Sequence, residues 1–309
     1  MTNCKSKVDI MKKIIAVLLC ILILAAGCAA TTTEEKMTLK VGVMPAVDTS
    51  PIYLAKDMGY FDELNLDVEI VLFTNAQDRQ SALQTGVIDG AMTDLVALAT
   101  NRSGGFDLKA TTLTDGMFVM LAQEGATDKA ELKVGLMEIS VSNFLVDHWL
   151  AETYKLEKVY INAIPARLEA VASGQLDMGF FPEPLGSVGE MKGLKKLVFE
   201  PVGGITPDIM AFTQTAIDAK SDALKAFHQA YDKAVEAINN DESLARETLV
   251  KNIPNISEEV KDIMTLPTYH KTRLPSVDYL QGIIDWTNGV VESELNVIPS
   301  DMIDTQFID

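Results

Sequence analysis

The chain has 309 residues, of which 48% are hydrophobic and 23% are charged, and its formal net charge is −18. This length suffices for about two domains of roughly 150 residues each, and the composition is that of a globular protein. The negative charge argues against nucleic acid as a partner, because phosphate binding requires clustered Lys and Arg. Solubility alone is a sufficient explanation for that charge.

The first 27 residues have the pattern of a secretory signal. Lys12 and Lys13 precede an apolar run over residues 14–26, which is too short for an ordinary transmembrane helix. We therefore expect residues 1–27 to be a signal peptide. Met11 could begin a complete signal by itself, so the true start, Met1 or Met11, stays open.

The apolar run ends in Leu-Ala-Ala-Gly-Cys, which resembles the bacterial lipobox. The resemblance implies that Cys28 is acylated and becomes the first mature residue, with residues 28–36 as a lipid-anchored tether. The alternative is ordinary signal cleavage with an incidental cysteine. Cys4 and Cys20 precede Cys28, so we expect the mature protein to lack disulfides, thiolate zinc sites and cysteine nucleophiles.

The first half of the chain alternates strands and helices. Ser50 and Pro51 begin a helix that ends before Gly59, and Asn75 caps another that reaches Thr85. Further helices and strands are expected at 39–44, 66–73, 88–92, 94–100 and 108–113.

The second half repeats this order. We expect strands at 132–136, 159–161, 176–181 and 195–199, and helices from Ser142 to Tyr154, from Pro165 to Gly174 and over 184–191. Such alternation predicts an α/β fold with a parallel sheet in each half and helices on both faces.

One pattern occurs twice, 88 residues apart: Arg-x-x-Ala-(Leu/Val)-x-(Thr/Ser)-Gly-x-(Ile/Leu)-Asp, starting at Arg79 and at Arg167. Gly86 and Gly174 stand where a left-handed residue would close a helix. A helix-to-strand joint used twice predicts two similar lobes with a cleft between them.

Two segments connect the predicted lobes. Residues 116–122 form one crossing and residues 203–213 the other, and two crossings imply a hinge. Asp241, Ser257 and Ser276 begin three of the C-terminal helices, after a longer one from Ser221, and we expect all of these to pack on the first lobe. The expected lobes are 37–115 plus 206–309 for lobe 1, and 116–205 for lobe 2.

Ligands of open α/β sheets bind at the carboxyl ends of the strands, where the following helices begin. The residues expected there are Pro45, Asp48, Thr49, Ser50, Thr74, Asn75, Thr93, Asp94, Asp115, Ser140, Ser142, Asn143, Pro182 and Glu183. The acidic members, together with Glu138, are expected on one rim without arginine. Arg79 and Arg167 could clamp an anion, but their place inside the first helical turns favours solvated helix faces or pairing with nearby acids.

Motifs typical of hydrolases, nucleotide-binding enzymes and metalloproteases are absent from the sequence. His148, His228 and His270 lack metal-ligand spacing, so we expect no metal, no cofactor and no catalytic residue. Because catalytic groups can assemble from distant positions, an enzyme stays open as an alternative.

The run Val-Gly-Val-Met-Pro at 41–45, the run Ser-Pro-Ile-Tyr-Leu-Ala-Lys at 50–56 and the run Gly-Tyr-Phe at 59–61 resemble one protein family. Residues 82–91, the Gly-Gln-Leu-Asp run at 174–177 and the Phe-Pro-Glu-Pro-Leu run at 181–185 fit it too. It comprises the substrate-binding proteins of bacterial ABC importers of the SsuA/THI5-like (NMT1-like) type, whose ligands include nitrate, sulfonates, taurine and thiamine precursors.

The resemblance implies the type II periplasmic-binding fold and a lipoprotein on the outer face of the cytoplasmic membrane. Its expected partners are a small-molecule solute and an ABC permease, and the protein is expected to be a monomer. A pyrimidine-synthase-like enzyme on the same fold and a signalling or scaffolding lipoprotein are the alternatives. The acidic rim favours a neutral polar or amine-bearing ligand, while a helix N-terminus keeps an anion open.

Overall fold

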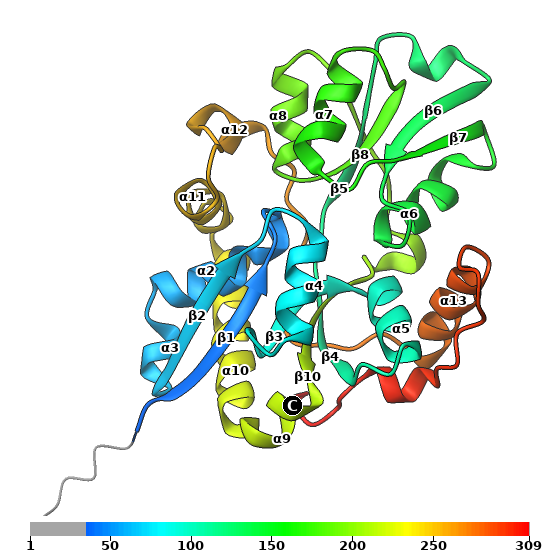
Figure 1. Ribbon diagram of the computed structural model, residues 1–309. Coiled ribbons are helices and arrows are strands. Elements are labelled where there is room, and N and C mark those ends of the chain that lie inside the picture. Colours follow the sequence, from blue (N-terminus) through cyan, green and yellow to red (C-terminus); the bar gives the residue numbers. More distant parts are fainter. Residues whose placement is uncertain (1–34, 309) are drawn as a thin grey trace, which may run out of the picture. The chain divides into compact units, whose positions relative to one another are not determined.

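The computed structural model describes residues 35–308 (Figure 1). Of these, residues 37–308 form one compact unit. The expected signal peptide, Cys28 and most of the tether lie outside the described residues, so the lipid anchor stays a prediction.

The first of two five-stranded sheets has the order β2-β1-β3-β10-β4. Its strands are β1 (Met37–Val43), β2 (Leu66–Leu72), β3 (Gly90–Asp94), β4 (Leu108–Thr114) and β10 (Asp208–Thr213). Strand β1 runs parallel to β2 and β3, whereas β10 runs antiparallel to β3 and β4.

The second sheet has the same plan, with the order β7-β6-β8-β5-β9. Its strands are β5 (Phe118–Ala122), β6 (Glu131–Leu136), β7 (Lys155–Tyr160), β8 (Met178–Pro182) and β9 (Lys195–Val198). Strand β5 is antiparallel to β8 and β9. The expectation of wholly parallel sheets was therefore wrong at β5 and β10, because each of these strands enters its sheet from the other one and runs against its neighbours.

The two segments expected to cross between the sheets do so. The chain leaves the first sheet after β4 and enters the second as β5, then returns after β9 to insert β10 into the first sheet. The expected architecture of two α/β halves joined by two crossings is confirmed.

Helices flank both sheets (Figure 1). Those of the first sheet are α2 (Ser50–Asp57), α3 (Tyr60–Glu63), α4 (Ala76–Gln84) and α5 (Leu95–Ser103), and those of the second are α6 (Val141–Leu150), α7 (Ile164–Ala172) and α8 (Leu185–Met191). The C-terminal part adds α9 (Gln214–Ala219), α10 (Ser221–Asn240), α11 (Ser243–Asn252), α12 (Glu258–Ile263) and α13 (Val277–Asn288).

Several helix boundaries differ from the predictions. Helices α10 and α11 are capped by Lys220 and Glu242, where Ser221 and Asp241 were expected to begin them. Helix α2 is capped by Thr49, after a short 3-10 turn over Val47–Thr49, so Ser50 is its first residue instead of its cap. Helix α6 is capped by Ser140, whose side chain accepts a hydrogen bond from the Ser142 N–H, and it ends at Leu150 instead of Tyr154. In a run of several Ser and Thr residues, each can serve as a cap, and composition does not choose between them.

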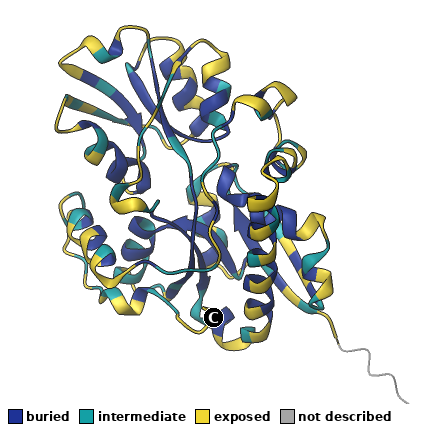
Figure 2. Ribbon diagram, turned by 180° about the vertical axis from the view of Figure 1, so that it is seen from behind, coloured by how far each residue is buried: buried dark blue, intermediate teal, exposed yellow. Residues whose placement is uncertain are grey.

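The C-terminal helices pack mainly on the first half, as expected. Helices α10 and α11 contact α2, and α13 contacts α5. Helix α12 differs, because it contacts α8 of the second half as well as α11. Figure 2 shows buried residues along the strands and exposed residues on the outer faces of the helices. None of the helices in residues 35–308 is long and apolar enough to span a membrane.

The repeated sequence pattern builds the same joint twice. Gly86 and Gly174 have φ angles of 69° and 76°, in the left-handed region that favours glycine. Asp89 accepts a hydrogen bond from the Lys40 N–H of β1 at 2.8 Å, and Asp177 accepts one from the Lys133 N–H of β6 at 2.8 Å. Each aspartate thus fixes the start of a central strand against its parallel neighbour.

Candidate functional site

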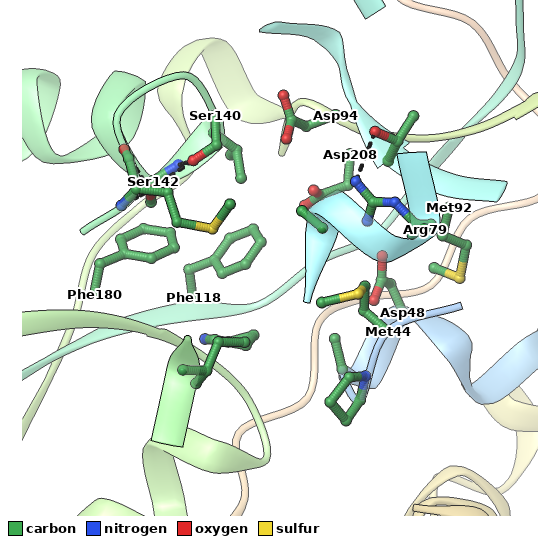
Figure 3. A pocket seen from close by; sticks show the side chains of 18 of the residues that line it. Met44, Asp48, Arg79, Met92, Asp94, Phe118, Ser140, Ser142, Phe180 and Asp208 are labelled. Carbon is green, nitrogen blue, oxygen red and sulfur yellow. Dashed lines mark hydrogen bonds between the residues drawn. The ribbon is translucent and has the colours of Figure 1, made fainter. Parts of the chain in front are cut away.

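A pocket that is partly open to solvent is lined by residues from both sheets. Figure 3 shows Asp48, Arg79, Asp94 and Asp208 on one side, and Ser140, Ser142, Phe118 and Phe180 on the other. The residues expected from the sequence that line it are Pro45, Asp48, Thr93, Asp94, Ser140, Ser142 and Pro182. They lie at the carboxyl ends of central strands: some end β3 and β8, and the others follow β1 and β6.

The other expected residues do not line this pocket: Thr49, Ser50, Thr74, Asn75, Asp115, Asn143 and Glu183. Most of them have local structural partners. The Thr49 and Ser50 hydroxyls donate to the carbonyls of Ala46 and Val47, and Asn75 caps α4. Asn143 donates to the Glu138 carbonyl, and Thr74 is exposed.

Asp115 lines a neighbouring pocket instead of this one. Its carboxylate accepts hydrogen bonds from the His270 N–H at 2.7 Å and from Arg273 Nη2 at 2.7 Å. It therefore ties the end of β4 to the segment that follows α12.

Glu183 is fully buried and fully engaged. Its carboxylate accepts hydrogen bonds from the Ser187 N–H at 2.9 Å, the Ser187 hydroxyl at 3.0 Å and Lys196 Nζ at 3.2 Å. The expectation that Glu183 faces the ligand is wrong for this pocket, because a carboxylate directly before a helix can bond that helix's first N–H groups instead of pointing outward.

Arg79 and Arg167 were expected on solvated helix faces or paired with nearby acids, and the solvated position is wrong for both. Both are buried, with exposed fractions of 7% and 1%, and both line the pocket. Each is the fourth residue of its helix, α4 and α7. Helical side chains point back toward the N-terminus, so a long side chain in the first turns reaches past the start of the helix. The rim therefore does carry arginine.

The two arginines make different contacts. Arg167 donates from Nε to the Phe180 carbonyl at 2.9 Å and from Nη1 to the Ile161 carbonyl at 2.7 Å. Arg79 donates from Nη2 to the Thr93 hydroxyl at 3.0 Å, and its Nε has no partner. Arg167 thus binds main chain, whereas Arg79 faces carboxylates.

Three aspartates of the pocket surround Arg79. Burial raises the pKa values of Asp48, Asp94 and Asp208, and the charge of Arg79 opposes this increase at each of them. The pKa of Asp48 is raised to about 6, although the Thr114 hydroxyl donates to its Oδ2 at 2.9 Å. Burial also lowers the pKa of Arg79.

The raised pKa of Asp48 predicts a pH-dependent stability. Its pKa in the folded protein, about 6, exceeds the ordinary value of 3.8, so the folded state binds more protons between these values and loses stability as pH rises through 6. Asp48→Asn keeps an acceptor for Thr114 and should increase the free energy of unfolding at pH 8 by up to about 3 kcal/mol. At pH 3, urea denaturation should give equal values for both proteins; a wild-type advantage at pH 8 would contradict this account.

Asp208 was missed by the sequence analysis, which treated its segment only as a crossing. It is the first residue of β10, paired with Asp94 of β3 and Thr114 of β4. A carboxylate directly before an otherwise apolar strand was the available indication. The side chain is 7% exposed, and its Oδ2 has no hydrogen-bond partner.

The opposite wall is largely apolar. The rings of Phe118 and Phe180 lie 4.8 Å apart at an angle of 32°. Met137 also lines the pocket, and Met44 and Met92 line it on the side of the carboxylates (Figure 3). In residues 35–308, no group of His, Cys, Asp and Glu has an arrangement that could hold a metal ion.

A family model described as the NMT1-like family matches residues 32–252, well over half of the chain. The chain belongs to the NMT1-like family. Among curated proteins, this NMT1-like chain is 28% identical over 63 residues to the nitrate import ATP-binding protein NrtC of Synechococcus elongatus. The match covers 20% of the chain and spans only 10% of the length of that relative.

Solved structures share its fold. The ligand-binding component of an ABC-type import system from Staphylococcus aureus has a TM-score of 0.74 at 18% identity, covering 88% of this chain and 97% of that one. The alkanesulfonate-binding protein SsuA from Xanthomonas axonopodis pv. citri has a TM-score of 0.72 at 16% identity, covering 88% and 100%. The periplasmic nitrate-binding protein NrtA from Synechocystis PCC 6803 has a TM-score of 0.59 at 14% identity, covering 89% and 77%. The expected fold of bilobed periplasmic binding proteins is confirmed.

Proposed function

We propose that this NMT1-like protein is an extracytoplasmic solute-binding component of an ABC importer. One observation carries the proposal: the pocket is lined by residues of both sheets, and the two sheets are connected by two crossings. Proteins with this fold include a ligand-binding component of an import system and binding proteins for alkanesulfonate and nitrate. Such a site serves capture and release of a small molecule.

The proposed lobes are 37–115 plus 206–309 for lobe 1, and 116–205 for lobe 2. A solute that contacts both lobes would stabilise the arrangement in which they close over it, because a ligand shifts an equilibrium by its differential affinity for the two states. The closed form would then be presented to the permease. Acylation of Cys28 would hold the protein, as a monomer, at the outer face of the cytoplasmic membrane.

The proposal predicts solute binding that depends on the pocket. Ala76, the first residue of α4, lines the pocket, so Ala76→Trp should fill part of it. Val198 of β9 is 52% exposed, and Val198→Trp is the matched control. A solute present at a hundred times its Kd should stabilise the wild type and the control by about 2.7 kcal/mol, and Ala76→Trp much less.

The measurement is a thermal-shift screen of small organic amines, alcohols, sulfonates and nitrate, followed by calorimetry of the positive compounds. Equal stabilisation of Ala76→Trp and wild type would place the solute elsewhere. Chemical conversion of a bound compound by the purified protein would favour the enzyme alternative.

A further inference from the structure

We propose that the pocket takes an organic cation, with an ammonium or amidinium group against Asp208 and Asp48 and an apolar body against Phe118 and Phe180. This rests on the proposed function and specifies its solute class. Four features of the pocket favour a cation: the placement of its carboxylates, a carboxylate oxygen without a hydrogen-bond partner, an excess of acidic over basic side chains, and the apolar wall.

Neighbouring backbone segments bring the carboxylates together. Asp208 begins β10, where its Cα pairs with that of Asp94 on one side and that of Thr114 on the other. The Thr114 hydroxyl in turn donates to Asp48 Oδ2 at 2.9 Å. All three acids line the pocket and are at least nine-tenths buried.

The Oδ2 atom of Asp208 is buried without a hydrogen-bond partner. Asp94, in contrast, accepts from the Ala97 N–H at 2.8 Å as the cap of α5. A buried acceptor left without a donor costs free energy, which a donor on a bound molecule would recover. Gly116 leaves room for this carboxylate, since a Cβ there would lie 2.2 Å from Asp208 Oδ2.

The cations that line the pocket do not neutralise these acids. Arg167 directs Nε and Nη1 at main-chain carbonyls, so Arg79 alone faces the three carboxylates from its own wall. No lysine is found among the described lining residues. With all three carboxylates ionised, an anionic solute on this wall would meet a surplus of negative charge, whereas an ammonium or amidinium would reduce that surplus.

The ionisation of the acids agrees with this assignment. Burial raises the pKa of Asp208 well above its ordinary value, and the charges of Asp48, Asp94 and Asp115 raise it further while Arg79 lowers it. Asp208 in turn contributes to the raised pKa of Tyr279, on α13. A bound cation favours the ionised carboxylates and would release protons on binding, whereas a bound anion would take protons up.

The apolar wall suits the rest of such a molecule. Phe118 and Phe180 face the carboxylates across the pocket, and Met44 and Met92 add apolar surface beside Asp48 and Arg79 (Figure 3). Aromatic faces also attract cations that approach within about 6 Å of the ring centre. A flat or short-chain body carrying one or two positive groups matches both walls.

The test compares three probes that differ only in their polar head: 2-phenylethylamine, 2-phenylethanol and 2-phenylethanesulfonate. Calorimetry on the wild type at pH 8 should show the amine binding about tenfold or more tightly than the other two. Amine affinity should fall between pH 8 and pH 5, and proton release should appear as a dependence of the heat on buffer ionisation. Tighter binding of the sulfonate or the alcohol would overturn the proposal.

Two variants locate the effect. Asp208→Asn preserves the shape of the side chain and should weaken the amine about tenfold or more while changing alcohol binding little. Asp222→Asn, at a side chain that is 89% exposed on α10, is the control and should match wild type. Equal amine affinity in Asp208→Asn and wild type would overturn the proposal. Pocket-dependent binding of an anion or alcohol without binding of any amine would overturn the cation and leave solute binding intact.

Discussion

Replacement of Glu183 by alanine is expected to lower the free energy of unfolding by about 3–5 kcal/mol, because it leaves a buried cation without its buried partner. The side chains of Glu183 and Lys196 are 0% and 9% exposed, and they form an ion pair at 3.2 Å. The same carboxylate accepts hydrogen bonds from the Ser187 N–H and hydroxyl. Removing it would leave several buried donors unsatisfied at once.

Glu190 provides the matched control. It pairs with the same Lys196 at 2.8 Å, but its side chain is 42% exposed. Solvent screens such a pair, so Glu190→Gln should cost less than about 1 kcal/mol. Urea denaturation at pH 7 compares the two variants. Equal losses of stability would show that burial does not set the strength of these pairs.

The position of Glu183 explains why its loss should be felt widely. Its N–H donates to the Met117 carbonyl in the first crossing, and its carbonyl accepts from the Val47 N–H, each at 2.9 Å. Its carboxylate also accepts from the Thr265 N–H at 3.3 Å. Glu183 therefore joins the end of β8 to the first crossing, to the turn after β1 and to the segment after α12. Its contribution to solute affinity should be indirect.

Much of the fold follows from local patterns in the sequence. Strands and helices alternate in both halves, and the repeated pattern that ends in Asp89 and Asp177 predicts a duplicated joint, which the structure contains. The directions of β5 and β10 could not be predicted from the sequence, because an apolar run has the same pattern whichever way the strand runs in its sheet. Whether Ser140 or Ser142 caps α6 was likewise undetermined.

The pocket was predicted in outline, since the strand-end rule brought Asp48, Asp94 and Ser140 to one place. The balance of acidic and basic side chains in the pocket was not predicted. Arg79 lies three residues beyond the start of its helix, and only the direction of helical side chains brings it into the pocket. Asp208 comes from the distant crossing, and the pairing of β10 between β3 and β4 places it beside Asp94. Glu183 is the opposite case: it is an acid at the end of a strand, but its carboxylate bonds buried groups of the protein instead of lining the pocket.

The equivalent positions of Arg79 and Arg167 allow one substitution to be compared in two settings. Arg167→Lys is expected to lower the free energy of unfolding by about 2–4 kcal/mol, because the single ammonium of a lysine cannot occupy both the Nε and the Nη1 positions. Burial lowers the pKa of Arg167 to about 10, so the guanidinium remains charged at neutral pH. The substitution therefore also replaces a buried charged group. Phe180 and Ile161 would each retain a carbonyl without this donor.

Arg79→Lys should cost much less, about 1 kcal/mol, because Arg79 makes one side-chain hydrogen bond and otherwise acts as a positive charge among carboxylates. Arg79→Met removes that charge and should strengthen binding of 2-phenylethylamine at pH 8 while destabilising the free protein. Urea denaturation and calorimetry on the three variants separate these effects. Equal destabilisation by the two lysine substitutions would contradict the division between a main-chain-binding arginine at 167 and a charge-balancing arginine at 79. The contrast thus shows that a repeated residue keeps its position in both halves while its partners determine its role.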